Sequence, residues 1–373
     1  MKIFIFQNAP VPYRTPLFKK LKEHYDIMVV YGVERAGDRY WDPALGGYPH
    51  HLLRGRNFRF RGKILTYAKG LRRYLRDNDF DLYFISDDWR SVLSSYSVAK
   101  WARRREKPLI MWCGAIDTPY RRTAMISKPI MAIHHTFMKF LIRHVDVFLA
   151  YGPKTVEFYA RRYRISEDRF IWGTQAAVPD ASPTIPKLAE IGEIITFLSI
   201  GYLEHRKGFQ DLITAAAQMT RRDFKLVIAG KGTYEARLRD MAKDDPRVEF
   251  VGYVEGEDKR RCFLAADVIV SPTYHDPWAN TLNEACIYGL PIITTPAEGA
   301  EGSLAIHGLN ALIVPPGDID KLRGALEFFL ENKSAIPAMG KKSKALAEKF
   351  NIGWVVENFA RAVQIALRDK QDD

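Results

Sequence analysis

The sequence predicts two doubly wound α/β domains, and three observations carry this prediction. The chain has 373 residues, which is more than one ordinary hydrophobic core organises. Short apolar runs alternate with helix-length segments along nearly the whole chain, as in parallel sheets whose strands are joined by helices. Residues 178–186, VPDASPTIP, hold three prolines and interrupt the alternation. This stretch is therefore predicted to be the linker between the two domains.

The first half contains enough apolar runs for one such sheet. Strands are predicted at 2–7, 26–31, 81–86, 108–112, 146–150 and 169–171. Helices are predicted at 13–23, 63–76, 91–105 and 128–143, and the last of these could be either a core helix or an interfacial one.

The pattern restarts after the linker. Strands are predicted at 195–200, 225–229, 248–251, 267–270 and 290–295. Helices are predicted at 209–219, 234–240, around 259–265, at 280–288 and at 354–370.

The composition is that of a globular protein, with 47% hydrophobic and 27% charged residues. The three cysteines show no paired spacing, so we predict neither a disulfide framework nor a zinc site, and we expect a reducing compartment. The first residues hold no signal-peptide core, and no apolar run reaches the ~18–20 residues of a spanning helix. We therefore expect a soluble, cytoplasmic protein.

The positive charge is concentrated in the first half. The chain as a whole carries +12; residues 1–180 hold 32 basic and 17 acidic residues (+15), which leaves 24 and 27 (−3) for the rest. Residues 53–76 alone hold nine Lys or Arg, no acid, and interleaved aromatic side chains. This asymmetry favours an anionic partner, either a membrane surface or a nucleic acid.

The stretch 271–295, SPTYHDPWANTLNEACIYGLPIITT, predicts the main functional site. It lies across a strand, a loop, a helix ending at Gly289 and a second strand, and ligands bind at the carboxyl ends of such strands. Asp276 and Glu284 fall in the loop and one turn into the helix. A carboxylate there can bind ribose hydroxyls, while backbone N–H groups at 280–282 can hold a phosphate. The pattern suits a nucleotide-sugar.

This segment resembles the E-x7-E motif of family 4 glycosyltransferases, which are retaining enzymes of the GT-B fold. The resemblance covers most of 195–315 and departs from the motif at Asp276, where the family has Glu. It also includes Gly201, Lys207-Gly208, Ile228-Ala229-Gly230-Lys231-Gly232, Phe250-Val251-Gly252, Ala265-Ala266-Asp267 and Gly308-Leu309-Asn310.

The resemblance implies two Rossmann-like domains facing across a cleft. Residues 1–180 would form the acceptor-side domain and 181–353 the donor-binding domain. The terminal helix, within 354–373, would cross back to the first domain.

The resemblance also implies roles in the donor site. Lys207 would neutralise the diphosphate of the donor, and Arg206 would supply the second cation, because Tyr202 stands where relatives have Arg. Asp276 would bind the donor sugar and Glu284 the ribose. Further donor contacts are expected from Gly201, Gly230, Lys231, Gly232, Tyr253, Val254 and the backbone of Asn280, Thr281 and Leu282.

Fewer candidates stand out in the first half. The loop 8–14 after the first strand lacks the glycines that relatives often have; Tyr13 and Arg14 there are candidates for the acceptor or sugar side, as is Asp117 after the fourth strand. Asp88 is expected to cap the following helix. Residues 79–81 spell D-x-D but precede a strand, so no metal site is predicted.

The predicted function is transfer of a hexose-type sugar, with retention, from a UDP- or GDP-sugar, UDP favoured. The acceptor would be a glycan or lipid-linked molecule of cell-surface polysaccharide or glycolipid synthesis. Neither a metal nor another cofactor is predicted. The basic half would contact the cytoplasmic face of the membrane, because many members of the family act on lipid-linked acceptors. The sequence predicts no oligomeric state.

Two alternatives stay open. A nucleotide-sugar epimerase of the same fold is disfavoured by Lys207 together with Asp276 and Glu284. A nucleic-acid-binding protein is suggested by the basic half, but no helix-turn-helix, zinc-finger or RNP-like motif supports it.

Overall fold

The structure is a computed structural model that describes residues 1–35, 45–60, 63–120, 128–176 and 191–368. Its chain divides into two compact units, and we describe each unit by itself. The first comprises Met1–Ile116, Met125–Gln175 and Ile352–Asp373; the second comprises Asp117–Ala124 and Ala176–Asn351. The predicted linker at 178–186 lies outside the described residues.

The first unit is built on a parallel sheet in the order β3-β2-β1-β6-β7-β8-β9. The chain adds strands outward from β1 in one direction and then, from β6, in the other, which is the doubly wound topology. The strands are β1 (Lys2–Gln7), β2 (Asp26–Tyr31), β3 (His50–Leu52), β6 (Leu82–Ser86), β7 (Leu109–Cys113), β8 (Val147–Ala150) and β9 (Phe170–Trp172).

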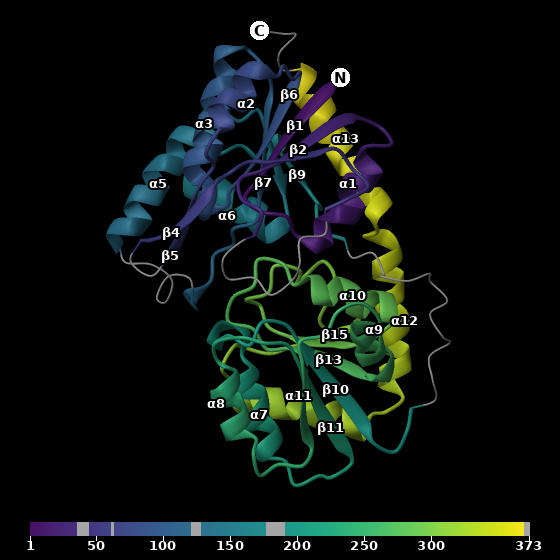
Figure 1. Ribbon diagram of the computed structural model, residues 1–373. Coiled ribbons are helices and arrows are strands. Elements are labelled where there is room, and N and C mark those ends of the chain that lie inside the picture. Colours follow the sequence, from purple (N-terminus) through teal and green to yellow (C-terminus); the bar gives the residue numbers. More distant parts are fainter. Residues whose placement is uncertain (36–44, 61–62, 121–127, 177–190, 369–373) are drawn as a thin grey trace. The chain divides into compact units, whose positions relative to one another are not determined.

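Helices cover both faces of this sheet, because its central strands are apolar on both sides. Figure 1 shows α2, α3 and α5 on one face and α1 and α13 on the other. The helices are η1 (Pro12–Arg14), α1 (Thr15–Leu21), α2 (Leu71–Asp77), η2 (Trp89–Ser91), α3 (Val92–Arg104), α5 (Lys128–Ile142), α6 (Pro153–Tyr163), η3 (Glu167–Arg169) and α13 (Ile352–Arg368).

Met138, Leu141 and Ile142 of α5 lie in the core of the first unit, whereas Phe140 is exposed. The end of α5 is therefore a core helix, one of the two possibilities that the sequence left open.

The prediction of one basic helix over 63–76 is wrong. Residues Lys63–Tyr67 instead form β5, an antiparallel hairpin with β4 (Arg56–Phe60). The run Ile-Leu-Thr-Tyr within β5 favours a strand, and the helix α2 starts only after Gly70, whose φ of +91° suits glycine. The predicted helix at 13–23 is likewise shorter, since it divides into η1 and α1.

The second unit has a parallel sheet in the order β12-β11-β10-β13-β14-β15. Renumbered from its own first strand this is 3-2-1-4-5-6, the order typical of dinucleotide-binding domains. The strands are β10 (Ile195–Ile200), β11 (Phe224–Ala229), β12 (Val248–Gly252), β13 (Val268–Ser271), β14 (Ile292–Thr294) and β15 (Ala311–Ile313). The predicted strands of this half thus all form, within two residues at each end.

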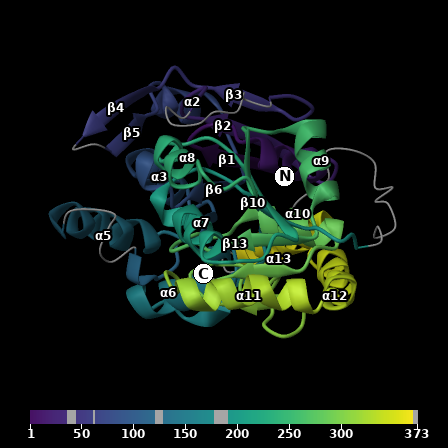
Figure 2. The same ribbon diagram turned by 90° about the horizontal axis from the view of Figure 1, so that it is seen from below.

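The helices of this unit also divide between the two faces of its sheet. Figure 2 shows α7 and α8 on one side of β10 and α9 and α10 on the other. They are η4 (His205–Lys207), α7 (Phe209–Ala217), α8 (Glu235–Met241), α9 (Gly256–Ala265), α10 (Asn280–Tyr288), α11 (Ile319–Glu331) and α12 (Ala335–Lys349). Together the two sheets confirm the prediction of two Rossmann-like domains.

The terminal helix α13 packs on the sheet of the first unit. Phe359 stacks on Phe84 of β6 with ring centroids 4.4 Å apart, and the Asn358 side chain donates to the Gly173 carbonyl at 3.2 Å. Gly173 has a φ of +102°, and a Cβ there would collide with the ring of Trp354. A glycine is therefore required where α13 crosses the end of β9.

One short segment differs from the expected division of the chain. Residues 117–120, which follow β7 of the first unit, contact the second unit instead. Asp117 thus belongs to the second unit rather than to the first, in which it was predicted.

No helix in the described part of the chain is long and apolar enough to cross a membrane. Cys113, Cys262 and Cys286 are all free thiols.

Candidate functional site

The predicted donor residues meet at the point where the strand order of the second sheet reverses. The loop after β10 carries Arg206 and Lys207, and the loop after β13 carries Asp276. These two strands are neighbours, so their loops leave the same edge of the sheet on opposite sides of the reversal. The Lys207 ammonium forms an ion pair with the Asp276 carboxylate across it. Such a reversal is where open α/β sheets bind their ligands.

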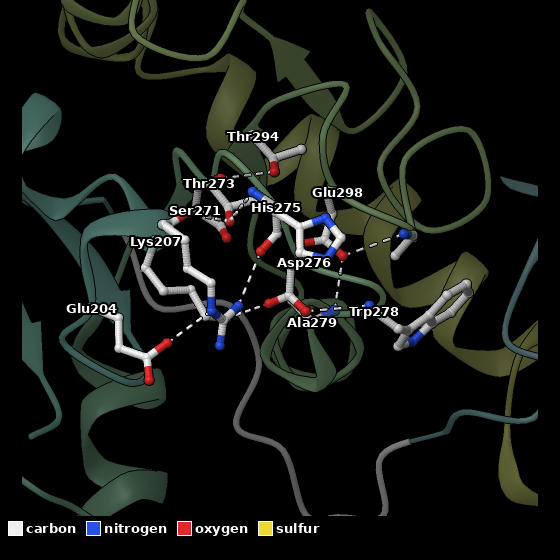
Figure 3. A network of polar contacts seen from close by, with 12 residues as sticks. Glu204, Lys207, Ser271, Thr273, His275, Asp276, Trp278, Ala279, Thr294 and Glu298 are labelled. Atoms are coloured by element: carbon white, nitrogen blue, oxygen red, sulfur yellow. Dashed lines mark hydrogen bonds and ion pairs between the residues drawn. The ribbon is translucent and has the colours of Figure 1, made fainter. Parts of the chain in front are cut away.

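Both the side chain and the backbone of Asp276 form hydrogen bonds with neighbouring loops. Its side chain is about 10% exposed, and its second oxygen accepts from the Trp278 amide at 3.2 Å. Its own backbone pairs with the loop after β14: the Asp276 amide donates to the Ala297 carbonyl, and the Gly299 amide donates to the Asp276 carbonyl. Figure 3 shows Asp276 in this network of contacts, which hold its carboxylate in place.

Arg206 supports the same loop. Its guanidinium donates to the His275 carbonyl at 3.0 Å and pairs with the Glu204 carboxylate at 2.8 Å. Its own carbonyl accepts from the Thr273 hydroxyl and the Tyr274 amide. The structure thus places Arg206 beside Lys207 and Asp276, as a second cation at the same edge.

Sequence reasoning missed Glu298, which lies next to Asp276. This carboxyl group is fully buried and accepts from the Ala279 amide at 2.8 Å and from the Ala300 amide at 3.3 Å. It thereby ties the start of α10 to the loop after β14, with Asp276 between them (Figure 3). Glu298 follows a strand within an Ala-Glu-Gly-Ala-Glu-Gly run, but only its pairing with Asp276 shows that it belongs to this site.

The pKa values of Asp276 and Glu298 are shifted in opposite directions. Burial and the negative charge of Asp276 raise the pKa of Glu298 to about 8. Burial alone would also raise the pKa of Asp276, but Lys207 and Arg206 outweigh it and lower that pKa below its ordinary value. At neutral pH the site therefore holds one carboxylate, Asp276, and one neutral carboxyl group, Glu298.

The amino-terminal end of α10 lies directly after this pair. Its N-cap residue, Ala279, has no side chain that can accept from the first turn. The Ala279 carbonyl accepts from the Leu282 amide at 2.9 Å, so the leading N–H groups that can meet a ligand are those of Asn280 and Thr281. Asn280 and Thr281 are half-buried and Leu282 is buried. An uncapped helix start with a lysine beside it can hold an anion.

Glu284 lies one turn into α10 and is partly buried. Its carboxylate pairs with the Lys259 ammonium of α9 at 2.7 Å. Lys259 was not among the predicted site residues, although it lies within the predicted helix around 259–265. The pair positions Glu284 on the side of α10 that faces α9.

The predicted glycines bring the strand-end loops together. A Cβ at Gly230 would collide with the Gly201 carbonyl, and one at Gly232 would collide with the Leu203 carbonyl. The Gly230 amide also donates to the Gly252 carbonyl at 2.7 Å. These glycines are therefore required by the packing of neighbouring loops, a reason that sequence reasoning did not include.

Three other predicted donor residues lie on the same loops. Lys231 is exposed, and Tyr253 and Val254 are half-buried. The Tyr253 hydroxyl donates to the Glu255 carboxylate at 2.9 Å.

His275, which precedes Asp276, contacts the segment 117–120. It is buried, and its Nδ1 lies 3.0 Å from the Thr118 hydroxyl of the segment 117–120. In the same segment Tyr120 stacks on His205, with ring centroids 6.1 Å apart. Asp117 itself is exposed at the start of this segment.

The remaining candidates belong to the first unit. Arg14 is buried and Tyr13 is 40% exposed, both in η1 after β1. Asp88 accepts from the Arg90 amide at 3.0 Å and caps the short helix η2, rather than the longer helix from 91 that it was predicted to cap, whose N-cap is Ser91. Asp79 pairs with Arg105 and Asp81 with Lys107. No group of three His, Cys, Asp or Glu side chains in the described residues is arranged to hold a metal ion.

Comparison with known proteins agrees with this geometry. Residues 183–349 match the family model of glycosyl transferases group 1. The lipopolysaccharide core biosynthesis glycosyltransferase LpsE of Rhizobium meliloti is 28% identical over 249 residues, which are 63% of this chain and 69% of LpsE. A GDP-mannose-dependent mannosyltransferase of Corynebacterium glutamicum, which acts on a monoacylated phosphatidylinositol monomannoside, is 30% identical over 185 residues, 47% of this chain and 48% of that protein.

Among solved structures, Anabaena HepE in complex with UDP superimposes with a TM-score of 0.75 at 17% identity, over 98% of this chain and 100% of HepE. This likeness shows the fold. The chain therefore has the GT-B fold, and residues 183–349 of its second unit are similar to glycosyl transferases group 1.

Proposed function

We propose that the protein is a retaining glycosyltransferase that takes a hexose-type sugar from a nucleotide diphosphate, with UDP as the favoured nucleotide. The observation that carries the proposal is the Lys207–Asp276 ion pair at the reversal of the second sheet, beside the uncapped start of α10. HepE, which shares the fold, binds UDP and UDP-glucose. LpsE belongs to lipopolysaccharide core synthesis, which supports a glycan or lipid-linked acceptor.

The charges suit the departure of a nucleoside diphosphate. When the bond between the anomeric carbon and the phosphate oxygen breaks, that oxygen gains negative charge. Lys207, Arg206 and the first N–H groups of α10 are fixed donors that can stabilise it. These groups act without a metal ion or another cofactor in this proposal.

Asp276 and Glu284 would bind the two sugars of the donor. Asp276 would accept from hydroxyls of the transferred sugar while its pair with Lys207 holds it in place. Glu284 would accept from the ribose diol. Retention follows from the resemblance to family 4 enzymes: the acceptor oxygen bonds to the face that the phosphate leaves, and its proton passes to the leaving phosphate oxygen.

A thermal-shift screen of UDP, GDP and ADP tests the donor site. A nucleotide that binds only the folded state raises the melting temperature by mass action. We expect UDP to raise it most, and Glu284→Ala to weaken UDP binding by about tenfold or more, because a hydrogen bond to a charged group contributes ~1.5–3 kcal/mol. The matched control Glu257→Ala, at an exposed carboxylate of α9 paired with Arg260, should bind UDP like the wild type. If no nucleotide shifted the wild type, the proposed function would be wrong.

An epimerase that uses the same nucleotide-sugar would also respond to UDP. Analysis of the products distinguishes the two functions. A transferase releases UDP only when the sugar passes to an acceptor or to water. An epimerase instead inverts a carbon of the sugar, and the sugar either stays attached to the nucleotide or leaves it by elimination.

The basic surface of the first unit supports a location at the cytoplasmic face of an anionic membrane. Exposed cations gather on the hairpin β4–β5 and on α2, and the hairpin also exposes two aromatic side chains, Phe58 at 46% and Tyr67 at 60%. The exposed cations are Arg54, Arg56, Lys69, Arg72, Arg73 and Arg76. Each can contribute ~1 kcal/mol near anionic headgroups.

Vesicle co-sedimentation tests this surface. The triple variant Arg56→Gln, Lys69→Gln and Arg72→Gln should bind phosphatidylglycerol-containing vesicles about a hundredfold less tightly, because three contributions of ~1 kcal/mol are lost. The matched triple variant Lys341→Gln, Lys342→Gln and Lys349→Gln on α12 should bind like the wild type. If the two triple variants lost vesicle affinity equally, only the net charge of the protein would matter. If the wild type bound vesicles of pure phosphatidylcholine equally well, the binding would not be electrostatic.

A further inference from the structure

Arg14 of the first unit is a buried cation, and the residues that contact its guanidinium in the described part of the chain are neutral. The residue is 7% exposed. Its guanidinium donates to the side-chain oxygen of Gln7 and to the Tyr151 hydroxyl, the latter at 2.8 Å, and lies 4.3 Å from the ring centroid of Trp112. Within the described residues no carboxylate forms an ion pair with it. A buried charge without a counter-ion is costly, and an aromatic face offsets only part of the cost.

The position of Arg14 is that of a ligand site. Gln7 ends β1, whereas Trp112 and Tyr151 belong to β7 and to the turn after β8, on the other side of the point where the strand order reverses between β1 and β6. The guanidinium therefore spans the reversal at the carboxyl edge of the first sheet, where this class of sheet binds ligands.

In the second unit, the cation at the corresponding place has an acidic partner. There the cation after the first strand, Lys207, pairs with Asp276, which follows the strand across the reversal. The acid at the corresponding place in the first unit is Asp87, after β6. One Asp87 oxygen accepts instead from the Gly114 amide, the Ala115 amide and the Tyr159 hydroxyl at 2.7–3.2 Å. Asp87 thus bonds to Gly114, Ala115 and Tyr159 rather than to Arg14.

Two neighbouring N–H donors at this place lack an acceptor. Arg14 Nε and Trp112 Nε1 are both buried and have no hydrogen-bond partner among the described residues. They belong to side chains in direct contact, and leaving such donors unmet costs free energy. A group with several acceptor oxygens and a negative charge would satisfy both and neutralise the guanidinium.

We propose that Arg14 and Trp112 form a receptor for a phosphate or carboxylate group in the first unit, and that this group belongs to the sugar acceptor. The anion would lie against Arg14 Nε and reach it past Tyr13, the exposed residue whose ring lies 5.9 Å from the guanidinium carbon. The assignment to the acceptor rests on the proposed function. The acceptor class would then be an anionic one, a phosphorylated or acidic sugar or a lipid phosphate, rather than a neutral glycan.

Calorimetric titration of the full chain with inorganic phosphate, at saturating UDP and constant ionic strength, tests the receptor. UDP occupies the donor site, so phosphate reports on a second site. We expect binding by the wild type and at least about tenfold weaker binding by Arg14→Gln, because a charge-assisted contact is lost. Arg104→Gln, which removes the same charge from an exposed position of α3, should leave binding unchanged. Arg14→Lys, which keeps the charge without the planar fork, should bind with intermediate affinity and serves if Arg14→Gln does not fold.

Glucuronate, glucose 1-phosphate and glucose then distinguish the source of the group. The two anionic sugars should compete with phosphate, and neutral glucose should not. Absence of phosphate binding by the wild type, or equal binding by Arg14→Gln, would overturn the receptor even if UDP binds normally. Failure of UDP to bind would overturn the proposed function. The phosphate titration would then still decide whether Arg14 forms an anion receptor. If phosphate bound but neither sugar competed, the assignment to the acceptor would fall.

Discussion

Replacing Lys207 by methionine is expected to lower the turnover number of sugar transfer by about 10²–10³, the usual cost of removing one fixed donor from a developing oxyanion. Lys207 is the cation nearest to Asp276 and lies beside the start of α10, where the diphosphate would develop its charge. The Michaelis constant for the donor should change less than the turnover number, because the diphosphate carries more negative charge in the transition state than in the bound donor. The measurement is steady-state release of the nucleoside diphosphate.

The variant also leaves Asp276 buried without its partner, which can cost ~3–5 kcal/mol of stability. The double variant Lys207→Met with Asp276→Asn separates the two effects, because it removes both charges together. We expect it to recover stability without recovering turnover. Lys243→Met, at an exposed lysine of the same unit, should behave like the wild type. A folded Lys207→Met variant with unchanged turnover would refute the role of Lys207.

The second large effect concerns the pH dependence of stability through Glu298. Its pKa lies at about 8 in the folded protein, above the ordinary value of ~4.5 for an unfolded glutamate. The folded state therefore binds the proton more tightly, and its stability is greatest below pH ~4.5. The contribution is lost progressively as the pH rises towards about 8 and is constant above it. The total loss is on the order of 5 kcal/mol, since a tenfold change in proton affinity corresponds to ~1.4 kcal/mol.

Glu298→Gln should remove this dependence. The amide keeps an oxygen that can accept from Ala279 and Ala300 but carries no titratable proton. We expect the difference in unfolding free energy between Glu298→Gln and the wild type to grow in favour of the variant from pH 5 to pH 9. Urea titrations at several pH values measure it. The control Glu348→Gln, at an exposed position of α12, should follow the wild type at every pH. A constant difference across this range would show that Glu298 does not titrate there.

Much of the second domain could be predicted from the sequence, because its signals are local. The run Ile195–Ile200 is apolar throughout, as a strand buried on both faces must be, and the structure has a strand with those bounds. The helix Asn280–Tyr288 was predicted to the residue, since its end is set by Gly289 in a left-handed conformation. Lys207 was predicted from the family resemblance and Asp276 also from its place after a strand; the structure brings the two side chains together, and their role in donor binding stays a prediction.

Other features depend on contacts between distant parts of the chain. The segment 63–67 carries the charges of a surface helix, and only pairing with Arg56–Phe60 makes it a strand. Glu298 is recognisable as part of the site only when its loop lies against Asp276. The sequence shows that Arg14 is basic but not that its neighbours are neutral.

The sequence by itself thus determined the fold class and the predicted strands of the second sheet, because strand and helix periods and glycine positions act over a few residues. The tertiary structure alone decided the charge states and the partners. Whether a carboxyl group is ionised, and whether a guanidinium lacks a counter-ion, depends on burial and on charges brought within a few ångströms by residues 20 to 140 positions away.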